Sequence, residues 1–408
     1  MPDVDLGTQV FDLAFNPKHD IVYTGLLDGH IKAFSYDDEG TCTSKFDIRP
    51  TKKTARSLTT DSDGLELYSV SKDRSIHIID TSTGKIIREQ ARAHDSAINR
   101  VTQFMSMLAT GDDDGVVKLW DPRQLSPIRS YIHHFDFISD FLWLQDKKQL
   151  VTTSGDGTLS VIDVRSSKVE PFAHSEDQED ELLSIVSIKD GKKVAVGTQT
   201  GIIGIWNRSS GWGDCVDRIK GHPHSVDALA TLSEDVIVTG SSDGLVRVVQ
   251  VLPNKLLGSF TGGITDHGTF PIERLRTDRN GAWLGSASHD NVLKLTDVRD
   301  ALVDSDADDS DADEGIDSSE EDGEEGGSLD GDSDSGSEQS GNAGQADRLE
   351  ETGDAESGSE SGQSETPAEP DSEPEPEPVL CRKRKKKTQL EGPGNKKGRE
   401  EDGFFDEL

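Results

Sequence analysis

A histidine, a hydroxyl residue and an aspartate recur together along this chain, in the combination that hydrolases use for nucleophilic catalysis. The clearest set is His94, Thr110 and Asp114. A catalytic nucleophile needs one convergent site with an oxyanion hole. Here related sets return at regular intervals, which is typical of a repeated structural hydrogen bond. We therefore expect these residues to support the fold, and we expect no enzyme activity from them.

Two short clusters have the residue types of metal ligands. One contains His133, His134 and Asp136, and the other contains Asp112 and Asp114. Neither is followed by a third or fourth ligand at the spacing of zinc sites or calcium loops. The glycines fall at turns and form no phosphate-binding loop. The sequence predicts no metal, no cofactor and no small-molecule substrate.

The elements that position these residues are strands that repeat along the chain. Seven copies of a strand, a small-residue turn and a second strand are anchored at Asp28, Asp73, Asp114, Asp156, Thr200, Asp243 and Asp290. Successive anchors are 41 to 47 residues apart, and such a period is typical of four-stranded propeller blades. The sequence predicts an all-β, seven-bladed β-propeller over residues 1–303.

A ring of sheets hides its edges only if it closes. After Asp297 the chain offers few residues before it turns acidic, which leaves the seventh blade without an outer strand. Residues 3–7 precede the first blade. We expect them to supply the missing strand.

The repeats carry paired polar elements. A histidine precedes several first strands, at His94, His134, His174, His222 and His267, and the third copy ends in Trp120–Asp121. These elements resemble the WD-repeat family, and the match covers residues 3–303. The resemblance implies a buried hydrogen-bonded tetrad in the third blade, made by His94, Thr110, Asp114 and Trp120.

The second copy departs from the others by gathering basic residues. Its preceding loop contains Lys52, Lys53 and Arg56, and its turn contains Lys72 and Arg74. In a propeller, the loops between blades and the turns between second and third strands emerge on the same face. These residues therefore form a candidate basic patch for phosphates or an acidic peptide. The alternative is an ordinary solvated loop.

Two consecutive copies end in an acid followed two places later by arginine, at Arg123 and Arg165. This pattern is similar to the paired motif by which some WD-repeat proteins dock on the adaptor of cullin-4-type ubiquitin ligases. The alternative is an arginine that lies on the lower rim of its blade.

Beyond the repeats the chain changes character. Residues 304–378 contain 29 acids against the single base Arg348, or −28 of the chain's net charge of −36. Such a composition predicts disorder. Four of its serines, each with an acid three residues later, are phosphorylation candidates: Ser305, Ser310, Ser318 and Ser319.

Residues 379–408 contain a basic cluster and a C-terminal peptide. Six consecutive basic residues form a nuclear localisation candidate, with contact to nucleic acid as the alternative: Arg382, Lys383, Arg384, Lys385, Lys386 and Lys387. Three scattered cysteines and the lack of a long apolar run indicate a soluble protein of a reducing compartment.

The opening VFDLAFNPKHDIVYTGLLDGHIKAFSY, the divergent repeats, the acidic and basic tail and the FFDEL ending are together similar to the WD repeat-containing protein 55 family. This resemblance implies a non-enzymatic nuclear and nucleolar scaffold in ribosomal RNA production and processing and in ribosome biogenesis. Its partners would be proteins of pre-ribosomal assemblies, with RNA contact left open. The alternative is a substrate receptor that docks a ubiquitin-ligase adaptor through Arg123 and Arg165.

Overall fold

The computed structural model describes residues 3–251, 254–259 and 267–299. Two sets of candidate residues lie outside these ranges. They are the phosphorylation candidates Ser305, Ser310, Ser318 and Ser319, and the basic cluster Arg382, Lys383, Arg384, Lys385, Lys386 and Lys387.

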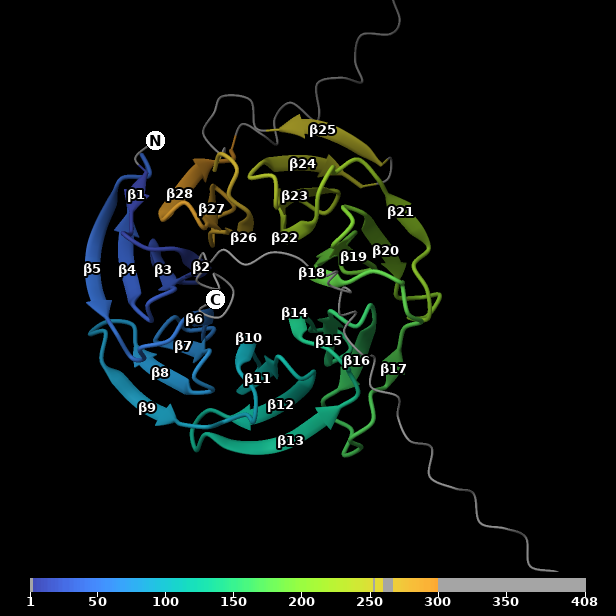
Figure 1. The fold of residues 1–408 in the computed structure, drawn as a ribbon, viewed down its shortest axis with the longest axis horizontal. Helices are drawn as coiled ribbons and strands as arrows, with labels where there is room; N and C mark the ends of the chain where they lie inside the picture. The colour runs from blue at the N-terminus through green and yellow to red at the C-terminus, as the bar shows by residue number, and fades with distance from the viewer. Residues whose placement is uncertain (1–2, 252–253, 260–266, 300–408) are drawn as a thin grey trace, which may run out of the picture. The chain divides into compact units, whose positions relative to one another are not determined.

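Within the described ranges, 28 strands form seven antiparallel sheets of four strands each. The sheets are arranged as blades around a common centre, with one inner strand of each blade nearest that centre (Figure 1). The inner strands are β2 (Val10–Phe15), β6 (Ala55–Thr60), β10 (Ile98–Phe104), β14 (Ile138–Leu144), β18 (Leu182–Ile188), β22 (Val226–Thr231) and β26 (Ile272–Thr277). The predicted seven-bladed β-propeller is confirmed.

The second and third strands of each blade are joined by the predicted small-residue turns. The second strands are β3 (Ile21–Leu26), β7 (Glu66–Ser71), β11 (Met107–Asp112), β15 (Gln149–Ser154), β19 (Lys193–Thr198), β23 (Val236–Ser241) and β27 (Trp283–Ser288). The third strands are β4 (Ile31–Tyr36), β8 (Ile76–Asp80), β12 (Val116–Asp121), β16 (Leu159–Asp163), β20 (Ile203–Asn207), β24 (Val246–Gln250) and β28 (Val292–Asp297).

The outer strands complete the blades. They are β5 (Cys42–Ile48), β9 (Ile86–Gln90), β13 (Ser126–Ile132), β17 (Ala173–His174), β21 (Asp217–Ile219), β25 (Lys255–Ser259) and β1 (Val4–Asp5). Burial follows this order. Every residue of β15, β23 and β27 is buried, whereas β5 and β9 have no buried residue. Second strands are covered by neighbouring blades on both faces, which explains their nearly continuous run of small and β-branched residues.

In five of the blades a turn glycine allows close contact with the next blade. Gly115 follows the turn of the third blade with φ of 81°, a backbone conformation that glycine adopts without strain. A Cβ at this position would lie 2.6 Å from the carbonyl oxygen of His134. The turn of one blade can therefore touch the loop that leads into the next only because it carries a glycine.

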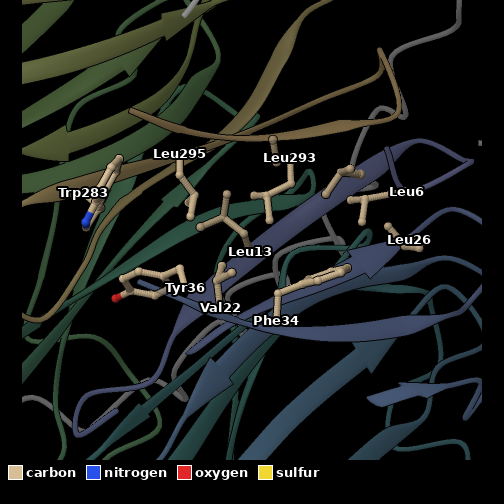
Figure 2. Packing of buried hydrophobic residues seen from close by; sticks show 11 residues of the cluster. Leu6, Leu13, Val22, Leu26, Phe34, Tyr36, Trp283, Leu293 and Leu295 are labelled. Atoms are coloured by element: carbon tan, nitrogen blue, oxygen red, sulfur yellow. The ribbon is translucent and has the colours of Figure 1, made fainter. Parts of the chain in front are cut away.

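The ring is closed by the N-terminal segment, as the sequence predicts. Strand β1 pairs with β28, with Val4 opposite Leu293, and the Leu6 amide donates to the carbonyl of Asn291 at 2.9 Å. Leu6 is 3% exposed and belongs to a cluster that includes Leu26 and Leu293 (Figure 2). Blade seven is thus built from both ends of the propeller sequence.

In the part of the chain that the structure describes, no helix is both long and apolar enough to cross a membrane.

Candidate functional site

The third blade contains a buried polar tetrad, with one member different from the predicted set. His94 places Nδ1 2.8 Å from Oδ2 of Asp112 and Nε2 2.6 Å from Oγ1 of Thr110. The indole Nε1 of Trp120 donates to the same Thr110 oxygen at 2.8 Å. Asp112 therefore supplies the carboxylate, and the prediction of Asp114 in this role is wrong. The Asp114 amide instead donates to Oδ1 of Asp112 at 3.1 Å.

The burial of this tetrad decides its role. Thr110 is fully buried and His94 is 1% exposed, so no substrate can reach the hydroxyl. Burial lowers the pKa of His94, although Asp112 opposes the shift. A neutral imidazole that donates from Nδ1 to the carboxylate and accepts at Nε2 from the threonine satisfies all these groups. The set joins the strands of its blade and performs no chemistry.

Blade seven has the same arrangement without a tryptophan. His267 places Nδ1 2.6 Å from Oδ2 of Asp290 and Nε2 2.7 Å from Oγ of Ser286. In blade six, the His222 side chain has one hydrogen-bond partner among the described residues, Thr239 at 2.8 Å, while Asp243 forms an ion pair with an arginine. The polar sets therefore vary from blade to blade.

The candidate metal ligands near blade four have other partners. His134 contacts Oδ2 of Asp156 at 3.1 Å and Oγ of Ser160 at 2.8 Å. His133 contacts the carbonyl oxygen of Val169 at 2.7 Å. Among the residues that the structure describes, no group of three histidine, cysteine or acidic side chains could hold a metal ion.

The loop and the turn that carry the predicted basic patch are bonded to each other. The Lys72 amide donates to the carbonyl of Thr54 at 3.0 Å, and the Thr51 hydroxyl contacts the Asp73 carboxylate. Thr51 thus takes the place that histidine occupies in other blades. Burial opposes ionisation of Asp73, but hydrogen bonds from Ser75 and Thr51 outweigh it and lower its pKa.

The basic side chains of this region do not share one environment. Lys52 and Lys53 are exposed, whereas the Arg56 side chain is 17% exposed and pairs with Asp113 at 2.8 Å. Arg74 donates to a backbone carbonyl at 3.3 Å. We call the face with these loops and second-to-third-strand turns the upper face. Lys52 and Lys53 lie on it as exposed charges, while Arg56 points to the channel.

The mouth of the central channel on the upper face is a cavity of about 680 Å³ lined by all seven blades. Each inner strand has one β-bulge, at an equivalent position. A bulge re-aims the side chain of its extra residue and often occurs beside functional sites. The seven extra residues all line the cavity: Phe11, Arg56, Asn99, Ser139, Leu183, Asp227 and Glu273.

Charge is distributed unevenly around this mouth. On blades two and three, Arg56 is paired with Asp113, and Arg100 donates to the carbonyl of Ser139. On blades six and seven, Asp227 and Glu273 bring like charge together. Burial, with the charge of Glu273 as the second cause, raises the pKa of Asp227 to about 7. Glu273 also lies 3.0 Å from Nε2 of His289, and its charge acts on Arg100. Asp227 and Glu273 form the acidic side of the cavity.

A second network lies on the residues that follow the bulges. Arg274 of blade seven places Nε 3.2 Å from Asp12 of blade one and NH1 3.0 Å from Asp140 of blade four. Arg274 and Asp12 are fully buried, and Asp140 is 6% exposed. Burial opposes ionisation of Asp140, but the neighbouring arginines lower its pKa. The network ties blade seven to its neighbour, blade one, and also to blade four, which is not adjacent to it in the ring.

Arg123 and Arg165 follow third strands and therefore lie on the lower face, opposite the channel mouth. Their side chains are 77% and 64% exposed. Each folds back on the aspartate two residues earlier: Arg123 donates to both oxygens of Asp121 at 2.9 Å, and Arg165 to those of Asp163 at 2.9 and 2.7 Å.

Comparison with known proteins agrees with this architecture. The family model WDR55 matches residues 1–301. The chain belongs to the WDR55 family. A relative in Coprinopsis cinerea, WD repeat-containing protein JIP5, is 53% identical over 307 residues, which cover 73% of this chain and 74% of that protein. The protein of the same name in Laccaria bicolor is 52% identical, with 76% and 78% covered.

Plant and animal members of the family are also similar. WD repeat-containing protein 55 of Arabidopsis thaliana is 38% identical, covering 76% of this chain and 86% of its own length. The protein of that name in Bos taurus is 35% identical, with 72% and 76% covered. Membership in a family of WD-repeat propellers indicates a protein-interaction scaffold.

Proposed function

We propose that this chain is a non-enzymatic nuclear and nucleolar scaffold in ribosomal RNA production and processing and in ribosome biogenesis. The observation that carries this proposal is the family match over the whole propeller, residues 1–301. The resemblance noted from the sequence links that family to nucleolar ribosome production. Two further features support a scaffold: the polar tetrad of its third blade is buried, and its upper face presents a cavity with contributions from every blade.

The upper face is the proposed partner-binding face. Lys52 and Lys53 are exposed on it, and Arg56 of the same blade lines the channel mouth. Exposed lysines attract phosphates and acidic peptides at long range, and this attraction weakens as salt rises. Partners of the scaffold would be proteins of pre-ribosomal assemblies, with precursor RNA as a second contact.

Affinity purification of the tagged full chain from nuclear extract tests this function. Mass spectrometry and RNA sequencing of the eluate should recover pre-ribosomal proteins and precursor ribosomal RNA. The double variant Lys52→Glu/Lys53→Glu should lose part of this material in a salt-dependent way. A matched control is Lys147→Glu/Lys148→Glu, which reverses two adjacent charges in the turn between β14 and β15 on the lower face.

Two results would contradict the proposal. One is an eluate dominated by a ubiquitin-ligase adaptor and cullin without ribosomal material, which would favour the substrate-receptor alternative. The other is equal loss of ribosomal material from both charge-reversed variants, because a general charge effect would then explain the capture.

A further inference from the structure

We propose that the mouth of the central channel binds one lysine or arginine side chain of a partner protein, with the carboxylates of Asp227 and Glu273 as its acceptors. This inference rests on the scaffold function proposed above and adds the chemistry by which the scaffold recognises a partner.

The cavity is large enough to hold a basic side chain. Its volume of about 680 Å³ lies within the range of roughly 300–1,000 Å³ typical of ligand pockets. Seven bulges, one on each inner strand, direct seven side chains into it. Because each bulge adds one residue to its inner strand, the lining of the mouth can vary while the strand pairing on either side of the bulge is kept.

The electrostatic balance of the cavity favours a cation. Its two arginines are engaged, Arg56 with the Asp113 carboxylate and Arg100 with a backbone carbonyl. Asp227 accepts a hydrogen bond of 3.1 Å from the neutral hydroxyl of Ser225 and is repelled by the charge of Glu273, whose carboxylate lies 3.0 Å from Nε2 of His289. An incoming ammonium or guanidinium group would relieve this repulsion and form charge-assisted hydrogen bonds.

Aromatic side chains of the cavity wall suit the stem of a long basic side chain. Phe11 and Phe137 line the cavity, and the Phe11 ring lies 5.3 Å from the ring of His289. The methylene groups of lysine and arginine pack on such apolar surface while the charged end reaches a polar partner. Aromatic faces also attract cations directly. A metal ion fits less well, since the described residues hold no three-ligand group for one.

Binding of a basic side chain should depend on pH. The groups that act on Asp227 are Glu273, His289 and Asp243, with a hydrogen bond from Ser225. With a pKa of about 7, Asp227 is mostly protonated at pH 6 and mostly ionised at pH 8. A cation binds the ionised form, so affinity should rise across this interval, by at most about tenfold.

Calorimetric titration of the full chain with three blocked tripeptides tests the inference. The probes are acetyl-Gly-Lys-Gly-amide, its arginine counterpart and its norleucine counterpart, which keeps the stem and lacks the charge. We expect the two basic peptides to bind at least about tenfold more tightly than the norleucine peptide. We also expect Asp227→Asn/Glu273→Gln to remove this preference and the pH dependence together.

The control variant is Asp38→Asn/Glu39→Gln, which removes the same two charges from an exposed turn on the lower face. It should bind as the unmodified chain does. Equal binding of lysine and norleucine peptides, or an unchanged preference in Asp227→Asn/Glu273→Gln, would overturn the proposal. Failure of the ribosomal function would appear differently, as basic-peptide binding that persists while nuclear extract yields no ribosomal material.

Discussion

Truncation of Leu6 to alanine tests how the ring is closed. The backbone of this residue holds its place independently of the side chain: its amide donates to Asn291, and its carbonyl accepts from Nζ of Lys32 at 2.8 Å. Leu6→Ala therefore removes packing and leaves these bonds available. The side chain is 3% exposed and contributes to the seam between blades one and seven (Figure 2).

The size of the effect follows from this burial. A buried leucine replaced by alanine costs about 2–5 kcal/mol of the free energy of unfolding. Unfolding entropy is roughly 2.1 cal/mol/K per residue, so for a domain of about 300 residues each kcal/mol lowers Tm by about 1.6 °C. Leu6→Ala should therefore lower Tm by about 3–8 °C.

Differential scanning calorimetry of the full chain measures this shift. The matched control is Leu65→Ala, because the Leu65 side chain is 64% exposed and such a site should change stability by less than about 0.5 kcal/mol. Hydrogen exchange should also accelerate in β1 and at the edge of β28. A Tm for Leu6→Ala within about 1 °C of the control would refute closure by the N-terminal strand.

Three further predictions concern buried polar groups, each read from urea unfolding. Asp112→Ala should lower the free energy of unfolding by about 1–3 kcal/mol, because it removes the carboxylate that His94 contacts. Asp114→Ala should lower it by less than about 0.5 kcal/mol. Equal losses in the two variants would contradict the tetrad assignment. Burial, with Arg247 as a second cause, lowers the pKa of His222 to about 4. The unfolded chain therefore binds more protons than the folded chain between pH 6.5 and 4. In this interval, each unit by which the pH is lowered should reduce the free energy of unfolding by about 1 kcal/mol. His222→Gln should reduce this dependence of the free energy of unfolding on pH. An unchanged dependence would show that other groups cause it. Arg274→Met should cost about 3–5 kcal/mol because it leaves buried carboxylates unpaired, and adding Asp140→Leu should recover part of it; no recovery would contradict the cross-ring pairing.

The blade architecture could be predicted because the same pattern of strand, turn and strand repeats along the sequence. The turns recur every 41 to 47 residues, and the sequence of the seventh blade lacks an outer strand after Asp297. That deficit pointed to residues 3–7, and β1 occupies this place. Local periodicity and the need to satisfy sheet edges were sufficient for these features.

The tetrad of the third blade was predicted with one wrong member. Three consecutive aspartates span the end of β11 and the start of the turn that follows it, and the anchor position fixed by the other repeats falls on Asp114. The carboxylate that reaches His94 belongs to Asp112, the last residue of the strand. Spacing alone could not choose between neighbouring carboxylates whose side chains point in different directions.

The channel mouth could not be found from the repeat pattern. Its seven bulge residues occupy one structural position but share no residue type, from Phe11 to Glu273. A comparison of the seven repeats therefore shows these positions only as variable ones. Their variety within an otherwise regular strand is the one signal the sequence offers. The Arg274 network was also missed, because it joins residues 134 or more positions apart that no local pattern connects.

Depletion of the chain from living cells tests the ribosomal scaffold role most directly. Ribosomal RNA is pulse-labelled after depletion, with rescue by the unmodified chain or by Lys147→Glu/Lys148→Glu. The proposed function predicts reduced mature ribosomal RNA or accumulated precursors on depletion, and restoration by both rescue chains. Unaltered synthesis and processing of labelled ribosomal RNA in the depleted cells would contradict it.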